Sequence, residues 1–187
     1  MKLILDSLKE ISENFKRLSN NDILNIDNAA SIMVKSLNNG GKIMFCGNGG
    51  SASDSQHLSA ELVGRFMKNR RALASVSLTT DTSIITAVSN DFSFNEIFSR
   101  QIEAIGNEDD ILYAISTSGK SQNIINALEK ANKMKIKTIC ITGNNDKFIK
   151  EFCDIIIKTP ASRSDRIQEM HIAIGHIICE IIENKLC

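Results

Sequence analysis

Three side chains suited to acid–base or metal chemistry recur every four residues in one segment of the chain. They are His57, Glu61 and Arg65. Residues four apart lie on the same face of an α-helix, so an imidazole, a carboxylate and a guanidinium would line one stripe. A solvated face with ion pairs would also account for Glu61 and Arg65. Because such a combination is unusual for packing, the stripe is interpreted as a carrier of functional groups.

The final helical segment, from about residue 164 to 184, carries further polar side chains within an apolar sequence. Gln168 and His176 are eight positions apart, roughly 80° around a helix axis and about 12 Å along it. They could share a metal ion only if both lean inward. His171 fits this face less well. A lone histidine among isoleucines is usually a hydrogen-bonded structural residue, so His176 has a structural alternative as well.

Two loops combine small or hydroxyl side chains with the start of a predicted helix. The sequence CGNGGSASD at 46–54 follows an apolar run, and its glycines permit tight turning and close approach of a ligand. The sequence STSGKS at 116–121 follows another apolar run and supplies hydroxyls. Free N–H groups and the positive end of the helix dipole make each loop a candidate phosphate site. His57 and Glu61 lie within one or two turns of the first loop.

Each loop alone also fits other functions. Residues 47–52 satisfy the relaxed dinucleotide pattern GxGxxG/A, with Asp81 as the ribose-binding acid, so a nucleotide-binding protein is the first alternative. The second loop mimics a P-loop through GKS at 119–121, but Ala114 stands where that motif requires its first glycine. Ordinary strand-to-helix turns with capping serines are the remaining alternative.

The elements that must position these groups follow from hydrophobic periodicity. Residues 2–38 carry apolar side chains at helical spacing, which predicts two amphipathic helices before any strand. Short β-type runs then alternate with helical stretches, which predicts an α/β fold with a parallel sheet covered by helices. The runs are KIMFC at 42–46, ASVSL at 74–78, ILYAI at 111–115, KTICI at 137–141 and DIIIK at 154–158.

The two ends of the chain indicate an oligomer. The final helix is apolar almost all the way round and should be sandwiched, and two amphipathic helices precede the first strand. A core shared between chains would explain both features, as would a thicker monomer. At 187 residues the chain suits one compact domain covering 1–187.

Composition excludes several classes of partner. Lys plus Arg equals Asp plus Glu at 22 each, so no net field exists to gather nucleic acid or an anionic membrane. No segment has the pattern of a signal peptide or a membrane span, which predicts a cytoplasmic protein. The five cysteines form no CxxC pair, so they are expected to be reduced and mostly buried.

Four segments together resemble the motif set of the phosphoheptose isomerases within the SIS (sugar isomerase) family. They are CGNGGSASDSQHLSAELVGRF at 46–66, NDF at 90–92, ISTSGKS at 115–121 and DRIQEMHIAIGH at 165–176. The resemblance covers nearly the whole chain, and the combination is highly specific. It implies an SIS-type three-layer αβα sandwich with a five-stranded parallel sheet. It further implies an N-terminal helical extension at 1–38 used in oligomerisation, and a homotetramer with active sites between subunits.

The resemblance also implies an activity and its residues. The activity is conversion of sedoheptulose 7-phosphate to D-glycero-D-manno-heptose 7-phosphate through an enediol, the first step of ADP- or GDP-heptose biosynthesis. Glu61 and His176 would be the acid–base pair, and one zinc ion per subunit would be held by His57, Glu61, Gln168 and His176. The substrate-binding positions carried over are Asn48, Gly49, Gly50, Ser51, Glu61, Arg65, Asn90, Asp91, Ser116, Thr117, Ser118, Ser121, Asp165 and Gln168.

A non-enzyme relative is the second alternative. The basic, serine-containing segment ASRS at 161–164 is also similar to the SIS-type regulator that binds the bacterial replication initiator. That relative lacks the glutamate and the final histidine, whereas this chain has Glu61 and His176. The carboxylate and the imidazole favour catalysis on a small sugar phosphate.

Overall fold

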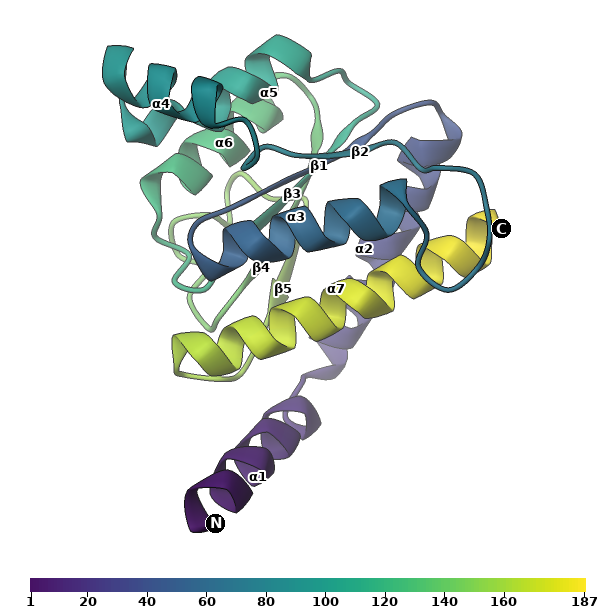
Figure 1. The fold of residues 1–187 in the computed structure, drawn as a ribbon, viewed down its shortest axis with the longest axis vertical. Helices are drawn as coiled ribbons and strands as arrows, with labels where there is room; N and C mark the ends of the chain where they lie inside the picture. Colours follow the sequence, from purple (N-terminus) through teal and green to yellow (C-terminus); the bar gives the residue numbers. More distant parts are fainter.

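A computed structural model describes residues 1–187 and shows an α/β arrangement of helices around one sheet (Figure 1). Both helices predicted before the first strand, all five predicted strands and the final helix are confirmed. In chain order the elements are α1 (Lys2–Lys16), α2 (Asn20–Asn38), β1 (Ile43–Gly47), α3 (Gly50–Val63), β2 (Ser75–Ser77), α4 (Thr82–Asp91), the 3-10 helix η1 (Phe94–Glu96), α5 (Ser99–Ile105), β3 (Ile111–Ser116), α6 (Gln122–Lys133), β4 (Lys137–Thr142), β5 (Ile155–Lys158) and α7 (Ser164–Leu186).

All five strands are parallel, in the order β2-β1-β3-β4-β5. Strand β3 is central: Ile111 pairs with Ile43 of β1 and with Lys137 of β4. Every residue of β1 and β3 is buried. A parallel sheet covered on both faces needs apolar side chains in both directions, and this explains the continuous apolar runs in the sequence.

Helices cover the two faces of the sheet in separate layers (Figure 1). Helices α2, α3 and α7 pack on the face to which Phe45 and Tyr113 point, and these two rings lie 5.3 Å apart between centroids. Helices α4, α5 and α6 pack on the other face, over Met44 and Leu112. The expected three-layer αβα sandwich is therefore confirmed.

Helix α7 lies beside α2 and α3, as its apolar sequence predicts. Ile174, Ile178 and Ile182 are at most 1% exposed, whereas Ile177 is 46% exposed. Helix α1 projects from the body of the molecule in Figure 1 and carries apolar side chains that are more than half exposed, namely Leu3, Ile4, Leu5 and Leu8. None of the helices combines the length and apolar character needed to span a membrane.

Candidate active site

The two candidate anion loops leave the same edge of the sheet, at the point where the strand order reverses. The chain passes from β1 to β2 on one side and then crosses to β3 on the other. Gly47, at the end of β1, pairs with Ile115 of β3, so the loops that follow these strands begin side by side. In open α/β sheets, ligands bind outside the carboxyl ends of the strands at such a switch point.

The second loop is a turn built from its own hydroxyls. Ser116 Oγ accepts the Gly119 N–H at 3.2 Å, and Ser118 Oγ accepts the Lys120 N–H at 3.2 Å. Gly119 has φ +62°, and a Cβ there would lie 2.2 Å from the Asn145 carbonyl oxygen, so only glycine fits. Ser121 occupies the N-cap of α6 without a side-chain capping bond, which leaves its hydroxyl available to a ligand.

A reciprocal amide pair connects the first loop to the helix that follows the second. Asn48 and Asn123 each donate to the other's side-chain oxygen at 2.8 Å, across the switch point. Beside the second loop lies an open hollow of about 420 Å³, a volume suited to a small ligand. It is lined by Thr117, Ser118, Lys120, Asn144, Asn145, Ala161, Ser162 and Ile167. Of the predicted binding residues, Thr117 and Ser118 therefore face a cavity directly.

Helices α3 and α7 bring His57, Glu61 and His176 together. His57 Nε2 lies 3.1 Å from Glu61 Oε1 and 3.0 Å from His176 Nε2. One ligand atom from each of the three residues lies within 4.8 Å of the others. The close approach depends on Gly175, where a Cβ would lie 2.6 Å from Leu58 Cδ2. Glu61 and His176, the predicted acid–base pair, thus lie close together although they come from distant segments of the chain.

This trio has the donor chemistry of a metal site. Zinc binds imidazole nitrogen and carboxylate oxygen, and catalytic zinc sites use three protein ligands with a further position open. Two imidazoles and one carboxylate converge here, and the His57 side chain is 51% exposed. The residues therefore fit a metal ion that a ligand in solvent could reach.

The surroundings of His176 favour its neutral form. Burial lowers the pKa of the His176 imidazole, the neighbouring His57 lowers it further, and Glu61 opposes both effects. The Phe66 ring stacks on His176, with centroids 5.6 Å apart and planes inclined by 28°. A neutral imidazole can accept a proton or bind a metal, as the site requires.

Arg65 is the clear correction among the predicted site residues. The four-residue spacing placed it on the helix face of His57 and Glu61, but α3 ends at Val63. Gly64 forms the C-cap with φ −76° and ψ −102°, which turns the chain out of the helix. Arg65 is exposed in the segment that follows. Its predicted place on the helix stripe is wrong because the helix ends two residues before it.

Gln168, in the first turns of α7, lies beside the first loop. A Cβ on Gly50 would lie 2.7 Å from Gln168 Nε2, so this amide packs against the first residue of α3. Asp165 accepts hydrogen bonds from Arg163 Nε and Nη2 at 3.2 and 2.6 Å. Neither contact joins these side chains to His176 within one chain.

His171 is a buried residue of α7 that takes no part in the trio. It is 1% exposed, and neither ring nitrogen has a partner at full hydrogen-bonding geometry. Burial lowers the pKa of its imidazole to about 4, and contact with the Thr142 backbone acts in the opposite direction. His171 is therefore neutral and packed, as a structural residue would be.

Other predicted residues lie apart. Asn90 and Asp91 are exposed at the end of α4, on the opposite layer from α3 and α7, with Asn90 Nδ2 donating to Asp91 Oδ1 at 2.8 Å. Asp81, the acid needed by the dinucleotide alternative, instead caps α4 by accepting the Ile84 N–H at 2.9 Å. Because the Asp81 carboxylate caps α4, its expected role as the ribose-binding acid of a nucleotide site loses its support.

Three residues near the site were missed in the sequence. Asn123 and Phe66 contribute through tertiary contacts, for which the sequence holds no local signal. Asp54 lies three residues before His57, and its Oδ2 is buried without a hydrogen-bond partner. Burial raises the pKa of the Asp54 carboxyl to about 6, and His57 partly offsets this. A motif with Asp and His three positions apart on a helix could have indicated Asp54.

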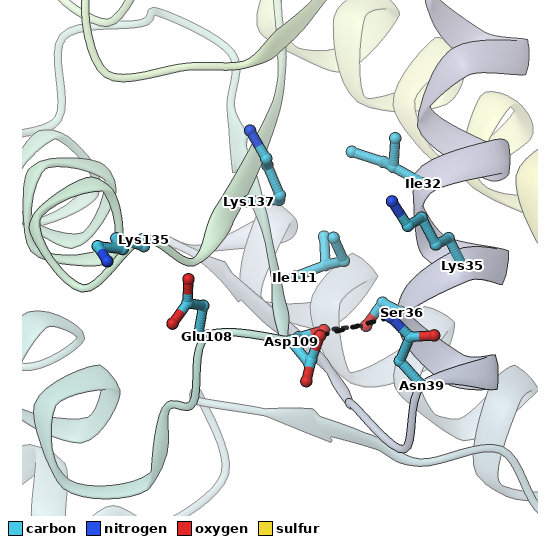
Figure 2. Close-up of a pocket in the computed structure, with 9 residues that line it drawn as sticks. All are labelled: Ile32, Lys35, Ser36, Asn39, Glu108, Asp109, Ile111, Lys135 and Lys137. Carbon is cyan, nitrogen blue, oxygen red and sulfur yellow. Dashed lines mark hydrogen bonds between the residues drawn. The ribbon is translucent and has the colours of Figure 1, made fainter.

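A second hollow, of about 280 Å³, lies at the opposite edge of the sheet, and Figure 2 shows the residues that line it. Ile111 and Lys137, which begin β3 and β4, lie in its wall, and Ser36 Oγ donates to the Asp109 carbonyl at 2.6 Å. The lining consists of Ile32, Lys35, Ser36, Asn39, Glu108, Asp109, Ile111, Lys135 and Lys137. It contains neither the trio nor either loop, so the candidate site lies elsewhere.

Comparison with known proteins agrees with this geometry. The SIS domain model matches residues 7–143. A phosphoheptose isomerase of Akkermansia muciniphila is 46% identical over 183 residues, covering 98% of this chain and 96% of that protein. The phosphoheptose isomerase of Rhodospirillum rubrum is 49% identical over 162 residues, covering 87% and 86% of the two chains.

Solved structures give the same result. The phosphoheptose isomerase from Neisseria gonorrhoeae superimposes with a TM-score of 0.91 at 38% identity, covering 98% of both chains. A phosphoheptose isomerase from Francisella tularensis gives a TM-score of 0.88, also at 38% identity, covering 98% of this chain and 95% of that one. The fold, the switch-point loops and the similarity over almost the whole length agree, and the chain belongs to the SIS domain family, among the phosphoheptose isomerases.

Proposed function

We propose that the chain isomerises sedoheptulose 7-phosphate to D-glycero-D-manno-heptose 7-phosphate, the first step of a nucleotide-activated heptose pathway that serves lipopolysaccharide or capsule. The observation that carries the proposal is the convergence of Glu61, His57 and His176 between α3 and α7. The family and its named relatives support the same substrate class. The proposed compartment is the cytoplasm, where the five free cysteines would stay reduced.

The reaction requires a base, an acid and stabilisation of charge. A ketose phosphate loses a proton from C1, passes through an enediol, and regains a proton at C2. Glu61 is proposed to move the carbon-bound proton between these two positions. His176, kept neutral by burial and by His57, serves the oxygen side or the opening of the sugar ring. Two groups in different electrostatic surroundings can thus divide the base and acid roles.

A metal ion is proposed to share this site. His57, Glu61 and His176 would hold one zinc ion per subunit, with Gln168 as the fourth ligand implied by the family resemblance. When bound, zinc would polarise the carbonyl and hydroxyl oxygens of the substrate as a Lewis acid. The chain's own residues would still position the sugar and move the protons.

Substrate binding is proposed at the switch point. The hydroxyls of Ser116, Thr117, Ser118 and Ser121 surround the start of α6, where a helix N-terminus favours a phosphate. Asn48, Gly49, Gly50 and Ser51 from the first loop, and Asp165 from α7, would contact the sugar. The exposed residues Arg65, Asn90 and Asp91 are included in the proposed binding set on the strength of the resemblance.

The distance along α3 supports active sites shared between subunits. Helix α3 begins at Gly50, and Glu61 lies eleven residues later, about three turns or 16 Å along the axis, which is farther than the one or two turns expected from the sequence. A single sugar phosphate would have to extend from the loops at the sheet edge to the far end of α3. A homotetramer, in which the second loop of one chain faces the trio of another, removes this difficulty. The exposed apolar residues of α1, such as Leu5 and Leu8, support such an assembly.

The first prediction concerns the proposed base. Glu61→Gln keeps the shape of the side chain but removes its basicity, so kcat should fall by about two to four orders of magnitude. Turnover is measured with purified sedoheptulose 7-phosphate, and zinc content and unfolding are checked in parallel. Glu151→Gln, an exposed position outside the site, should behave like the unchanged protein. Near-normal turnover of Glu61→Gln would remove Glu61 from the mechanism.

The second prediction concerns the phosphate loop. Ser118→Asp places a carboxylate beside the proposed phosphate, so KM should rise at least tenfold through charge repulsion. The matched control is Asn132→Asp, which adds the same charge at the exposed far end of α6. Steady-state kinetics of both variants measure the difference. An equal KM in the two variants would show that the phosphate binds elsewhere.

The third prediction concerns the metal. Protein purified without chelators should contain about one zinc per chain, and removal by a chelator should abolish turnover until zinc is restored. Elemental analysis and the assay are performed on the same samples. Activity that persists after zinc falls below about one-tenth equivalent would restrict His57 and Gln168 to orientation of the substrate.

The fourth prediction tests shared sites. Chains carrying Glu61→Gln and chains carrying Ser118→Asp are expressed together with different tags, and mixed oligomers are isolated by purification on both tags. If each site combines the trio of one chain with the loop of another, some sites in the mixture are intact and activity should recover well above either parent. Activity no higher than that of the parents would mean that each site is built from one chain.

A further inference from the structure

A buried ion pair lies just beyond the trio, at the end of α3. Arg70 Nε donates to Glu183 Oε1 at 2.9 Å, and each side chain is only 3% exposed. Arg70 follows α3 in the chain, whereas Glu183 lies in the last turns of α7. The pair therefore links the two helices that carry the trio.

The Glu183 carboxylate also organises the segment that leaves α3. It accepts the N–H groups of Phe66, Met67 and Lys68 at 3.2, 2.8 and 2.8 Å. Three successive backbone donors and one guanidinium thus converge on a single carboxylate. Burial raises the pKa of this carboxyl, but the backbone bonds and Arg70 outweigh it, so the pKa is lowered and the group is ionised.

The Arg70 guanidinium binds the other side of the same junction. Its Nη2 donates to the Glu61 carbonyl oxygen at 2.8 Å, and its Nη1 donates to the Leu62 carbonyl at 2.9 Å and the Gly64 carbonyl at 3.4 Å. The last carbonyls of a helix have no partner within the helix, so Arg70 acts as a side-chain cap for α3. One of the capped groups belongs to Glu61 itself.

Both halves of this network reach the trio. Glu183 follows His176 by seven residues, which is two turns on nearly the same face of α7. Phe66, whose N–H Glu183 holds, stacks on the His176 ring. The ion pair thus anchors both the backbone of Glu61 and the segment of Phe66, whose ring covers His176, to helix α7.

We propose that Arg70 and Glu183 are positioning residues that set the separation of Glu61 from His176. They thereby keep these groups at the distance that proton transfer and metal binding require. A buried ion pair is often no more stabilising than an apolar replacement of the same size. The seven hydrogen bonds described above tie the end of α3 and the segment after it to α7, and they give this pair a geometric role instead. The inference rests on the proposed function, since it names residues that support the same site.

The main test is Glu183→Gln, which keeps the volume but removes the charge and one acceptor oxygen. Zinc affinity, measured by competition with a chromophoric chelator, should weaken by about tenfold to a hundredfold, as for other residues that orient metal ligands. The kcat should fall at least tenfold, with KM changed less than about twofold, because substrate contacts are untouched. Unfolding by urea is followed for every variant.

The matched control is Asp110→Asn. Asp110 is also a buried carboxylate, 2% exposed, which pairs with Lys42 Nζ at 2.5 Å and accepts the N–H groups of Lys42 and Asn107 at 2.8 Å each. It lies before β3, at the sheet edge away from the site. This variant should lose stability but keep the kcat and the zinc affinity of the unchanged protein. If Glu183→Gln behaves in the same way, the pair is purely structural and the proposal is overturned.

A second variant guards against a protein that fails to fold. Arg70→Lys retains the positive charge beside Glu183, but a single ammonium cannot reach the carbonyls at 61, 62 and 64 together. It should lower kcat and zinc affinity with a smaller loss of stability than Glu183→Gln causes. Unchanged kcat and unchanged zinc affinity would overturn the proposal. Zinc affinity is independent of turnover. If the protein without substitutions has no isomerase activity, the proposed function fails. The variants' zinc affinity would still test this inference, so the two failures are distinguishable.

Discussion

The contact between α3 and α7 is the constraint on which the site depends. Leu58 packs where Gly175 leaves room, and any Cβ at position 175 would lie 2.6 Å from it. His57 precedes Leu58 in the chain and His176 follows Gly175. The Nε2 atoms of the two histidines consequently lie 3.0 Å apart. A larger residue at 175 would separate the helices and with them the histidines. Packing of an apolar side chain against a glycine thus determines whether the polar groups can act together.

Much of the fold could be predicted from the sequence because its signals are local. Buried parallel strands require continuous apolar runs, so all five strands could be located. The site loops could also be located, since glycine and hydroxyl residues follow two of those runs. Arg65 shows the limit of helical spacing: the rule assumes that the helix continues, and Gly64 ends it. The Asn48–Asn123 pair could not be predicted, because it joins residues 75 positions apart through tertiary contact.

Topology explains why the candidate site has two separated parts. A helix that follows a parallel strand must run back along the sheet, so the start of α3 lies at the carboxyl edge and Glu61 lies three turns away. The phosphate loop after β3 stays at the carboxyl edge. The fold therefore separates the proposed phosphate anchor from the acid–base groups. Contribution of the two parts by different subunits is a direct way to bring them together.

Local charge at the site differs from the charge of the whole chain. The net charge is zero, so no overall field attracts a phosphorylated sugar, and the proposed loop relies on hydroxyls and a helix start instead. At the trio, burial and His57 lower the pKa of His176 while Glu61 acts against them. If Glu61 moved away, the imidazole would lose its only stabilising charge and would bind a proton more weakly. The spacing between α3 and α7 therefore sets both the geometry and the proton affinity of the site.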